Sequence, residues 1–326
     1  MTETRRTPDV QQWFDRRTFT HFKPDAGLLA EMKRALDLRI SVCLPALNEE
    51  GTVGAICEAI RSEMIAAHDL VDELVVMDSG SSDRTVELAD ANGATVFRAA
   101  DVLPHLGEIP GKGEALWKSL AVLTGDIVVW ADSDTINFRS SSITNLVAPL
   151  LLDDKIVYTK GFYRRPPVRS ADGSPAGGRV TEIAIRPLLH LLYPCLTGLI
   201  QPLAGDYAGW RRELMQLPFF TGYAIEIGLL VDLVERHGLD AIAQVDLGDR
   251  VHRNRDTLAL GRTAHEIMLA LVSRLRYAGR IDLPESPSET LVQFDHGPLG
   301  PEPRTSIQPI MQRPPMARVL QGGENG

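Results

Sequence analysis

From residue 39 onward, short apolar runs alternate with stretches of helical spacing, and this rhythm limits the possible fold more than any other feature of the sequence. Four runs have the length and the apolar, β-branched content of strands: 39–44, 74–77, 95–98 and 126–131. Between them lie three stretches with helical spacing: 52–67, 84–92 and 113–123. Strands that alternate with helices predict an α/β fold built on a doubly wound, mostly parallel sheet.

Polar segments follow three of the predicted strands at their carboxyl ends. They read PALNEE (45–50), DSGSSD (78–83) and DSD (132–134). Doubly wound sheets bind their ligands beyond the carboxyl ends of the strands. We therefore expect the three segments to line one cleft.

Asp132 and Asp134 stand two positions apart, and residues at this spacing point the same way in an extended chain. Two carboxylates that share one spot repel each other unless a cation lies between them. An isolated pair of this kind more often caps a turn. The two companion segments favour a metal site instead, and hard oxygen ligands suit Mg²⁺ or Mn²⁺ bound together with a phosphate group.

The first two polar segments each allow two interpretations. PALNEE either begins a helix capped by Thr52, with its acids near the positive end of the helix dipole, or forms a loop whose amides and Glu49 contact a nucleobase and ribose. In DSGSSD, small residues would let a ligand approach the backbone, while Ser81 or Ser82 could cap the next helix. Both interpretations of DSGSSD can hold together.

The segment GKGE (111–114) is not a P-loop, because Leu106 and Gly113 stand where that motif requires Gly and Ser or Thr. Lys112 nevertheless lies between two glycines at a predicted helix start, where phosphate groups bind. The alternative is an ordinary solvated lysine.

The second half of the chain carries the main basic clusters. Such arginines usually form surface ion pairs, but the glycine-rich stretch 177–181 indicates an anion nest, in which amides and a guanidinium hold phosphate or carboxylate. His252 is either a core histidine or a metal ligand from across the cleft. The arginines concerned are Arg164, Arg165, Arg179, Arg253 and Arg255.

Composition excludes several classes of protein. The net charge of −9 argues against a nucleic-acid-binding surface. Three cysteines without metal-site spacing read as buried thiols of a reducing cytoplasm. No apolar signal segment is visible at the N-terminus, and the most apolar stretch, 183–205, is broken by charged residues and prolines, so it predicts buried helices and no membrane span. We expect a soluble, cytoplasmic protein.

Outside the regular α/β part, the pattern is less clear. Residues 1–38 form an N-terminal extension with one predicted helix, and residues 284–326 form a Pro/Gly-rich tail whose last part, 311–326, is predicted to be extended or disordered. Three further segments have expected structures: a long loop at 163–179 and helices at 180–200 and 223–237.

Together these segments resemble a GT-A glycosyltransferase. That resemblance rests on PALNEE, DSGS, PGKGEALW and DIVVWADSD in their order along the chain. Later segments are similar to a narrower family, the actinobacterial glucosyl-3-phosphoglycerate and mannosyl-3-phosphoglycerate synthases, which are retaining enzymes. These segments are FYRRP (162–166), GGRVTE (177–182), QPLAGDYA (201–208), GYAIEIGLL (222–230), DAIAQVDLG (240–248) and HRNR (252–255). The resemblance covers roughly residues 39–255.

The resemblance implies roles for the matching residues. The nucleotide would be held by Pro45, Ala46, Leu47, Glu49, Ser79, Lys112 and, beside the metal, Ser133. The metal ligands would be Asp132, Asp134 and His252, and the sugar pocket would be lined by Leu203, Tyr223 and Glu226. The acceptor would be bound by Arg165, Gly178, Arg179, Val180, Thr181 and Asn254, with Arg255 near the donor phosphates. Catalysis would depend most on Asp134, Lys112, Leu203 and Glu226.

The resemblance also implies a reaction. A hexose, mannose or glucose, would pass from a nucleotide sugar (GDP-mannose, GDP-glucose or UDP-glucose) to the 2-hydroxyl of 3-phosphoglycerate, giving a precursor of a compatible solute or a polysaccharide. Configuration would be retained by a front-face route in which the leaving phosphate helps to take the acceptor proton. Residues 39–160 would bind the nucleotide sugar, residues 161–283 would bind the acceptor, and the protein would be a homodimer.

Two rival functions stay open. A sugar-phosphate nucleotidyltransferase also uses acids, a metal and a doubly wound sheet, but it requires a glycine-rich basic loop after the first strand, which PALNEE is not. The second rival is a protein that binds nucleotides without catalysing a reaction. Spacing does not decide between glucose and mannose or between UDP and GDP, and the differing N-terminal region tilts the prediction slightly toward the mannosyl branch.

Overall fold

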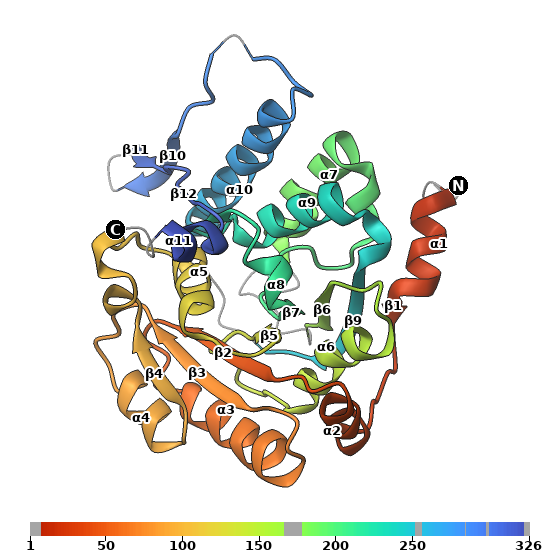
Figure 1. Cartoon of the computed structure of the whole chain (residues 1–326). Helices are drawn as coiled ribbons and strands as arrows, with labels where there is room; N and C mark the ends of the chain where they lie inside the picture. Colours follow the sequence, from red (N-terminus) through yellow and green to blue (C-terminus); the bar gives the residue numbers. More distant parts are fainter. Residues whose placement is uncertain (1–7, 166–177, 252–255, 284, 298–299, 323–326) are drawn as a thin grey trace.

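The computed structural model describes residues 8–165, 178–251, 256–283, 285–297 and 300–322. In this part of the chain an eight-stranded sheet has the order β1-β9-β6-β7-β5-β2-β3-β4 (Figure 1). Its strands are β1 (Thr18–Phe19), β2 (Ile40–Ala46), β3 (Glu73–Asp78), β4 (Thr95–Arg98), β5 (Ile127–Trp130), β6 (Tyr158–Arg164), β7 (Tyr207–Trp210) and β9 (Ile242–Asp249). Only β7 among them runs antiparallel to its neighbours. The predicted α/β fold with a mostly parallel sheet is confirmed.

Helices cover both faces of this sheet (Figure 1). They are α1 (Pro8–Arg17), α2 (Ala26–Ala35), α3 (Val53–Ala59), α4 (Thr85–Ala91), α5 (Lys112–Val122), α6 (Ser141–Leu152), α7 (Arg186–Leu192), α8 (Arg211–Leu214), α9 (Ile225–His237), α10 (Thr257–Tyr277) and α11 (Met316–Gly322). The helical segment predicted over 180–200 consists of a π-helical turn (Val180–Ile185), α7 and a 3₁₀ turn (Pro194–Gly198). Pro187 and Pro194 each lie at a helix start, where a missing N–H is tolerated, and so divide the segment.

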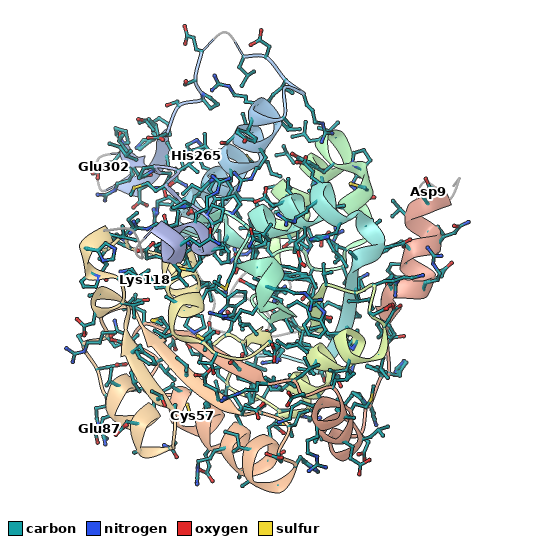
Figure 2. All side chains as sticks on the ribbon, in the orientation of Figure 1. Asp9, Cys57, Glu87, Lys118, His265 and Glu302 are labelled. Carbon is teal, nitrogen blue, oxygen red and sulfur yellow. The ribbon has the colours of Figure 1, made fainter. Side chains whose placement is uncertain are left out.

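The core lies in two layers, one on each face of the sheet. Along β5, Val128 and Trp130 pack with residues of α5 and α9, whereas Ile127 and Val129 pack with residues of α3 and α6. All four side chains are fully buried, as expected for central strands of a sheet covered on both sides. Charged side chains such as Glu87 and Glu302 lie at the rim of the molecule (Figure 2). No helix of the described residues is both long and apolar enough to cross a membrane.

The C-terminal segment departs from its prediction. The expectation of an extended or disordered end is wrong for the described residues, because β12 (Gln312–Arg313) pairs with β8 (Phe219–Phe220) and α11 follows it. Met316 of α11 is fully buried in the core layer that contains α5. Ahead of it, β10 (Thr290–Gly297) and β11 (Gly300–Ile307) form an antiparallel hairpin.

Candidate active site

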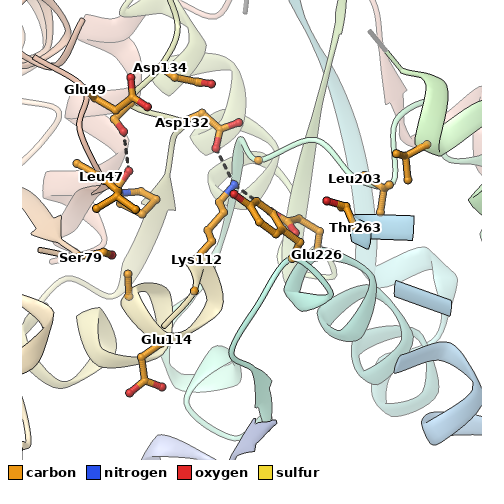
Figure 3. Close-up of a pocket in the computed structure, with 18 of the residues that line it drawn as sticks. Leu47, Glu49, Ser79, Lys112, Glu114, Asp132, Asp134, Leu203, Glu226 and Thr263 are labelled. Carbon is orange, nitrogen blue, oxygen red and sulfur yellow. Dashed lines mark hydrogen bonds and ion pairs between the residues drawn. The ribbon is translucent and has the colours of Figure 1, made fainter. Parts of the chain in front are cut away.

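A cavity of about 670 Å³ opens beyond the carboxyl ends of β2, β3 and β5 (Figure 3). Every described residue to which the resemblance assigns a role lines this one cavity. From the first half of the chain these are Pro45, Ala46, Leu47, Glu49, Ser79, Lys112, Asp132, Ser133 and Asp134. From the second half they are Arg165, Gly178, Arg179, Val180, Thr181, Leu203, Tyr223 and Glu226. His252, Asn254 and Arg255 lie outside the described residues.

The loops after β2 and β3 are tied together by hydrogen bonds. The amide of Asn48 donates to the Ser81 hydroxyl at 2.9 Å, and the amide of Glu49 donates to the Thr85 hydroxyl at 2.7 Å. The predicted serine cap of α4 is therefore wrong, since Ser81 serves the neighbouring loop and Asp83 accepts from the Thr85 amide. These hydrogen bonds fix the PALNEE loop at the edge of the cavity.

The DSD segment is fastened to the same loop. Thr52 donates its hydroxyl to the Ser133 carbonyl at 2.6 Å, and the Ser133 hydroxyl donates to the Pro45 carbonyl at 2.6 Å. Thr52 makes no side-chain cap for α3, contrary to the prediction, because its hydroxyl is used here. These bonds set Asp132 and Asp134 on the cavity wall with half-buried carboxylates.

Lys112 begins α5 and reaches across the cavity floor (Figure 3). Its Nζ lies 2.6 Å from Asp132 Oδ1 and 2.9 Å from Glu226 Oε1. Burial alone would lower the pKa of Lys112, but the two carboxylates outweigh it and hold this pKa well above the usual value. Lys112 therefore carries a positive charge at any physiological pH.

Two glycines allow this arrangement. A Cβ on Gly113 would lie 1.9 Å from the Phe220 carbonyl oxygen, so only glycine lets the start of α5 pack on β8. A Cβ on Gly205 would lie 2.1 Å from Asp132 Oδ1 and 2.3 Å from Lys112 Nζ. Gly205 is thus the floor beneath the ion pair, although sequence reasoning did not single it out within QPLAGDYA.

Another part of the cavity wall is basic. Arg165 lies beside Gly178, whose φ is +75°, and donates to the Tyr163 hydroxyl at 3.2 Å. Arg179 donates to the Thr257 hydroxyl at 3.4 Å from the start of the π-helical turn. Arg164 is not part of this wall, because it forms an exposed ion pair with Asp249. Two guanidinium groups and a positive-φ glycine make a wall suited to an anion.

A buried arginine that the sequence analysis missed lines the cavity just after β9. Arg250 is 2% exposed and donates to the Thr135 hydroxyl at 3.1 Å and to Asp206 Oδ1 at 3.3 Å. Next to it, Val251 accepts from the Ile136 amide at 3.3 Å. These hydrogen bonds therefore attach the segment after β9 to the residues that follow Asp134. Nothing in the sequence pattern of β9 marks Arg250 as different from a surface arginine.

One face of α10 completes the cavity. Leu260, Thr263 and Ile267 line it and are spaced three and four residues apart, the spacing of a single helix face. That spacing was the signal that could have found them.

Within the described residues, no group of three or more histidine, cysteine and acidic side chains gathers as a complete metal site. Asp132 and Asp134 supply two oxygen donors on one wall.

Comparison with known proteins places these features in context. The model of glycosyl transferase family 2 matches residues 41–215. A glucosyl-3-phosphoglycerate synthase of Petrotoga mobilis is 46% identical over 270 residues, which cover 82% of this chain and 83% of that protein.

Solved structures show the same similarity. The mannosyl-3-phosphoglycerate synthase from Rubrobacter xylanophilus matches with a TM-score of 0.88 and 33% identity, covering 95% of this chain and 99% of that one. The glucosyl-3-phosphoglycerate synthase from Mycobacterium tuberculosis, in complex with Mn²⁺, UDP-glucose and phosphoglyceric acid, matches with a TM-score of 0.81 and 43% identity over 93% and 99% of the two chains. Other crystals of that enzyme hold UDP with Mg²⁺ or Mn²⁺.

Proposed function

Because the chain belongs to glycosyl transferase family 2, and within it to the glucosyl-3-phosphoglycerate synthases, we propose that it transfers glucose from UDP-glucose to the 2-hydroxyl of 3-phosphoglycerate. It is a hexosyltransferase with the GT-A fold. The observation that carries the proposal is a single cavity lined both by the carboxylates of Asp132 and Asp134 and by the guanidinium groups of Arg165 and Arg179. The sequence relative reported above is named a glucosyl-3-phosphoglycerate synthase, so the proposal takes glucose as the first donor and does not follow the slight tilt toward the mannosyl branch.

Mannose remains the second donor to test, for a specific reason. The mannosyl-3-phosphoglycerate synthase of R. xylanophilus has the higher TM-score, 0.88 against 0.81 for the M. tuberculosis enzyme, at lower sequence identity. Backbone shape and sequence thus favour different sugars, and only the sugar pocket decides. That pocket would be lined by Leu203, Tyr223 and Glu226.

The nucleotide would bind beside the two hydrogen-bonded loops that follow β2 and β3. Glu49 would contact the ribose, and small side chains would let the diphosphate approach the backbone. The residues proposed for this part are Pro45, Ala46, Leu47, Glu49, Ser79 and Ser133, all of which line the cavity.

The acidic wall fits Mg²⁺ or Mn²⁺. Asp132 and Asp134 offer hard oxygen donors on one side only, which suits an ion that keeps waters and phosphate oxygens in its shell. His252 is proposed as a third ligand, and its sequence neighbour Val251 lines the same cavity. Such an ion, when bound, would neutralise charge that grows on the departing diphosphate.

Lys112 would supply the protein's own share of that stabilisation. Its charge is fixed before the reaction, and its flexible stem can turn from Asp132 to a phosphate oxygen without leaving Glu226. Because Glu226 Oε1 accepts from Lys112 at 2.9 Å, this carboxylate is poorly prepared to act as a covalent nucleophile. We therefore favour the front-face route with retention, in which the leaving phosphate takes the acceptor proton.

The basic wall would hold 3-phosphoglycerate. The acceptor carries a phosphate and a carboxylate, and Arg165 and Arg179 can each form charge-assisted hydrogen bonds with one of them. Gly178, Val180 and Thr181 would add backbone and hydroxyl donors. Asn254, outside the described residues, is proposed with them, and Arg255, also outside these residues, is proposed near the donor phosphates. Holding both substrates in one cavity converts their encounter into an oriented reaction.

The test is a product assay with two nucleotide sugars. Purified protein with Mg²⁺, 3-phosphoglycerate and UDP-glucose should release UDP and form glucosyl-3-phosphoglycerate, and GDP-mannose is compared in parallel. Asp134→Ala should abolish metal-dependent turnover with an unchanged melting temperature, whereas Asp90→Ala, an exposed carboxylate of α4, should keep full activity. Full activity of Asp134→Ala refutes the metal assignment.

The rival functions predict other outcomes. A binding protein would release no nucleoside diphosphate in this assay, and a nucleotidyltransferase would release pyrophosphate in a separate incubation with UTP and a sugar phosphate. The homodimer stays a prediction, which light scattering of the purified protein would decide.

A further inference from the structure

The loop between β4 and α5 forms one wall of the cavity and has an unusual backbone. Ala99, Glu108, Ile109, Pro110 and Gly111 line the cavity. The loop follows β4, and β4 pairs with β3, whose end carries Ser79. It is therefore the donor side of the cavity that this loop closes. Residues with positive φ at three places, 50° at Leu103, 69° at Gly107 and 138° at Gly111, prevent a regular hydrogen-bond ladder within it.

Two buried cations hold the carbonyls of this loop. Lys118 Nζ donates to the Ala99 carbonyl at 2.7 Å and to the Gly107 carbonyl at 3.2 Å. Arg313 donates to the Leu106 carbonyl at 3.0 Å and to the Gly107 carbonyl at 3.1 Å. Lys118 comes from α5 (Figure 2), and Arg313 comes from the C-terminal β12.

Glu114 joins the two cations into one cluster. Arg313 forms a bidentate ion pair with Glu114, with distances of 2.8 Å and 2.7 Å to the two carboxylate oxygens. Lys118 Nζ lies 3.7 Å from Glu114 Oε1. Their exposed fractions are 1% for Glu114, 0% for Lys118 and 9% for Arg313. Glu114 follows the catalytic candidate Lys112 by two residues in α5.

The segment that carries Arg313 is itself fixed to the catalytic framework. Trp117 of α5 donates its indole N–H to the Pro314 carbonyl at 2.8 Å, and the Arg313 guanidinium lies 5.1 Å from the centre of the same ring. The Thr221 amide, next to β8, donates to the Met311 carbonyl at 3.0 Å. Arg313 is thus attached to α5 and β8, the two elements whose close packing sets Lys112.

A cluster of this kind is a poor means of stabilisation and a good means of specifying position. Buried ion pairs lose much of their attraction to desolvation, and apolar residues of the same volume often stabilise a protein as well or better. What the ion pairs add is geometry, because a planar guanidinium fixes two carboxylate oxygens and two carbonyls at once.

We propose that Arg313 is a positioning residue of the donor site, which sets the loop 99–111 against Lys112 through Glu114 and the carbonyls of Leu106 and Gly107. The inference rests on the proposed function for its kinetic consequence. It makes the C-terminal segment, which lies beyond the family match at 41–215, a part of the donor site.

The test compares Arg313→Lys and Arg313→Met with a matched control. The lysine variant keeps the positive charge, but a lysine cannot form a bidentate ion pair with Glu114 and at the same time donate to the carbonyls of the loop. We expect the KM for UDP-glucose to rise about tenfold or more in both variants, a loss of roughly 1.4 kcal/mol in donor binding, with the KM for 3-phosphoglycerate within about twofold of wild type. The control is Lys33→Met, which removes another buried cation, 3% exposed and 2.9 Å from Asp72, on the far side of the sheet. It should lower the melting temperature and leave both KM values unchanged.

Hydrogen exchange of the loop amides gives a readout that does not depend on activity. In Arg313→Lys the amides of residues 102–111 should exchange faster than in wild type, whereas in Lys33→Met they should not. Unchanged exchange in this loop, or equal rises in the KM of both substrates, overturns the proposal. If Arg313→Met does not fold, Arg313→Lys decides alone. A wild-type protein that releases no UDP defeats the proposed function, and loop exchange still shows whether Arg313 positions the loop.

Discussion

Replacing Gly205 by alanine should disable the enzyme without unfolding it. The new methyl group would lie 2.1 Å and 2.2 Å from the two carboxylate oxygens of Asp132 and 2.3 Å from Lys112 Nζ, whereas ordinary contacts begin near 3.4 Å. Both neighbouring groups are the ends of flexible side chains. The φ of Gly205 is not positive, so alanine causes no backbone strain at this position. The backbone can therefore stay in place while Asp132 and Lys112 move.

The size of the effect follows from the distance that these groups must move. Relief of the overlap requires a shift of about 1 Å in the carboxylate and the ammonium, and a misplacement of that size can lower a rate by about 100-fold. We expect kcat/KM to fall by about that factor and the Mg²⁺ concentration for half-maximal rate to rise. The assay is UDP release over a series of Mg²⁺ concentrations, with the melting temperature measured on the same samples. The loss of stability should be limited, because Lys112 keeps its pair with Glu226.

Gly209→Ala is the matched control. This glycine lies on β7, where a Cβ would meet Tyr158 Cδ2 and the Val157 carbonyl at 3.2 Å, so neighbours move by only a few tenths of an ångström. It should cost some stability and little activity. If Gly205→Ala turns over like wild type with the same Mg²⁺ dependence, the placement of Asp132 and Lys112 is not the one that catalysis uses.

Two other variants test separate features of the same region. Lys112→Met removes the ammonium from between Asp132 and Glu226, and loss of such a preorganised charge should lower kcat about 100- to 1,000-fold at saturating substrates; a fall below tenfold in a UDP-release assay would contradict the role. Lys160 is 1% exposed, and burial lowers its pKa from 10.5 to about 7. Its folded pKa lies below its unfolded one, so the cost of burying it is largest below pH 7 and vanishes above pH 10.5. Lys160→Met should therefore raise the free energy of unfolding at pH 7 by as much as about 4 kcal/mol, and a gain that does not shrink in urea melts toward pH 9.5 would refute this account.

The cleft could be predicted from the sequence because its position follows from local patterns. Short apolar runs fix the strands, parallel strands bring their carboxyl ends to one edge, and polar segments at those ends must meet. Asp132, Glu49 and Ser79 are brought to the cavity by this rule alone. Leu203 and Glu226 needed the resemblance, since their neighbourhood has no periodicity that points to a site.

The C-terminal segment could not be predicted because its structure depends on partners far away in the chain. The strands β12 and β8 have two residues each, too few to show a period of two. Arg313 meets Glu114 at a separation of 199 residues. No local pattern distinguishes such an arginine from a solvated one. The hydroxyls of Ser81 and Thr52 failed as predicted caps for a related reason, because each has a better partner in a neighbouring loop.

If the proposed function holds, the substrates would replace partners that the acids and bases of the cavity now have in the protein. Lys112 lies between Asp132 and Glu226, and a diphosphate bound with a metal ion would offer Asp132 a cation and Lys112 new oxygens. No charge would then be left buried and unpaired, which is the costly outcome. A phosphorylated acid without a metal would offer Asp132 no cation, and its charges would match Arg165 and Arg179, which line the same cavity. The two anionic substrates would thereby be distinguished by the presence of the metal, and the carboxylates that would repel a bare diphosphate would bind its metal complex.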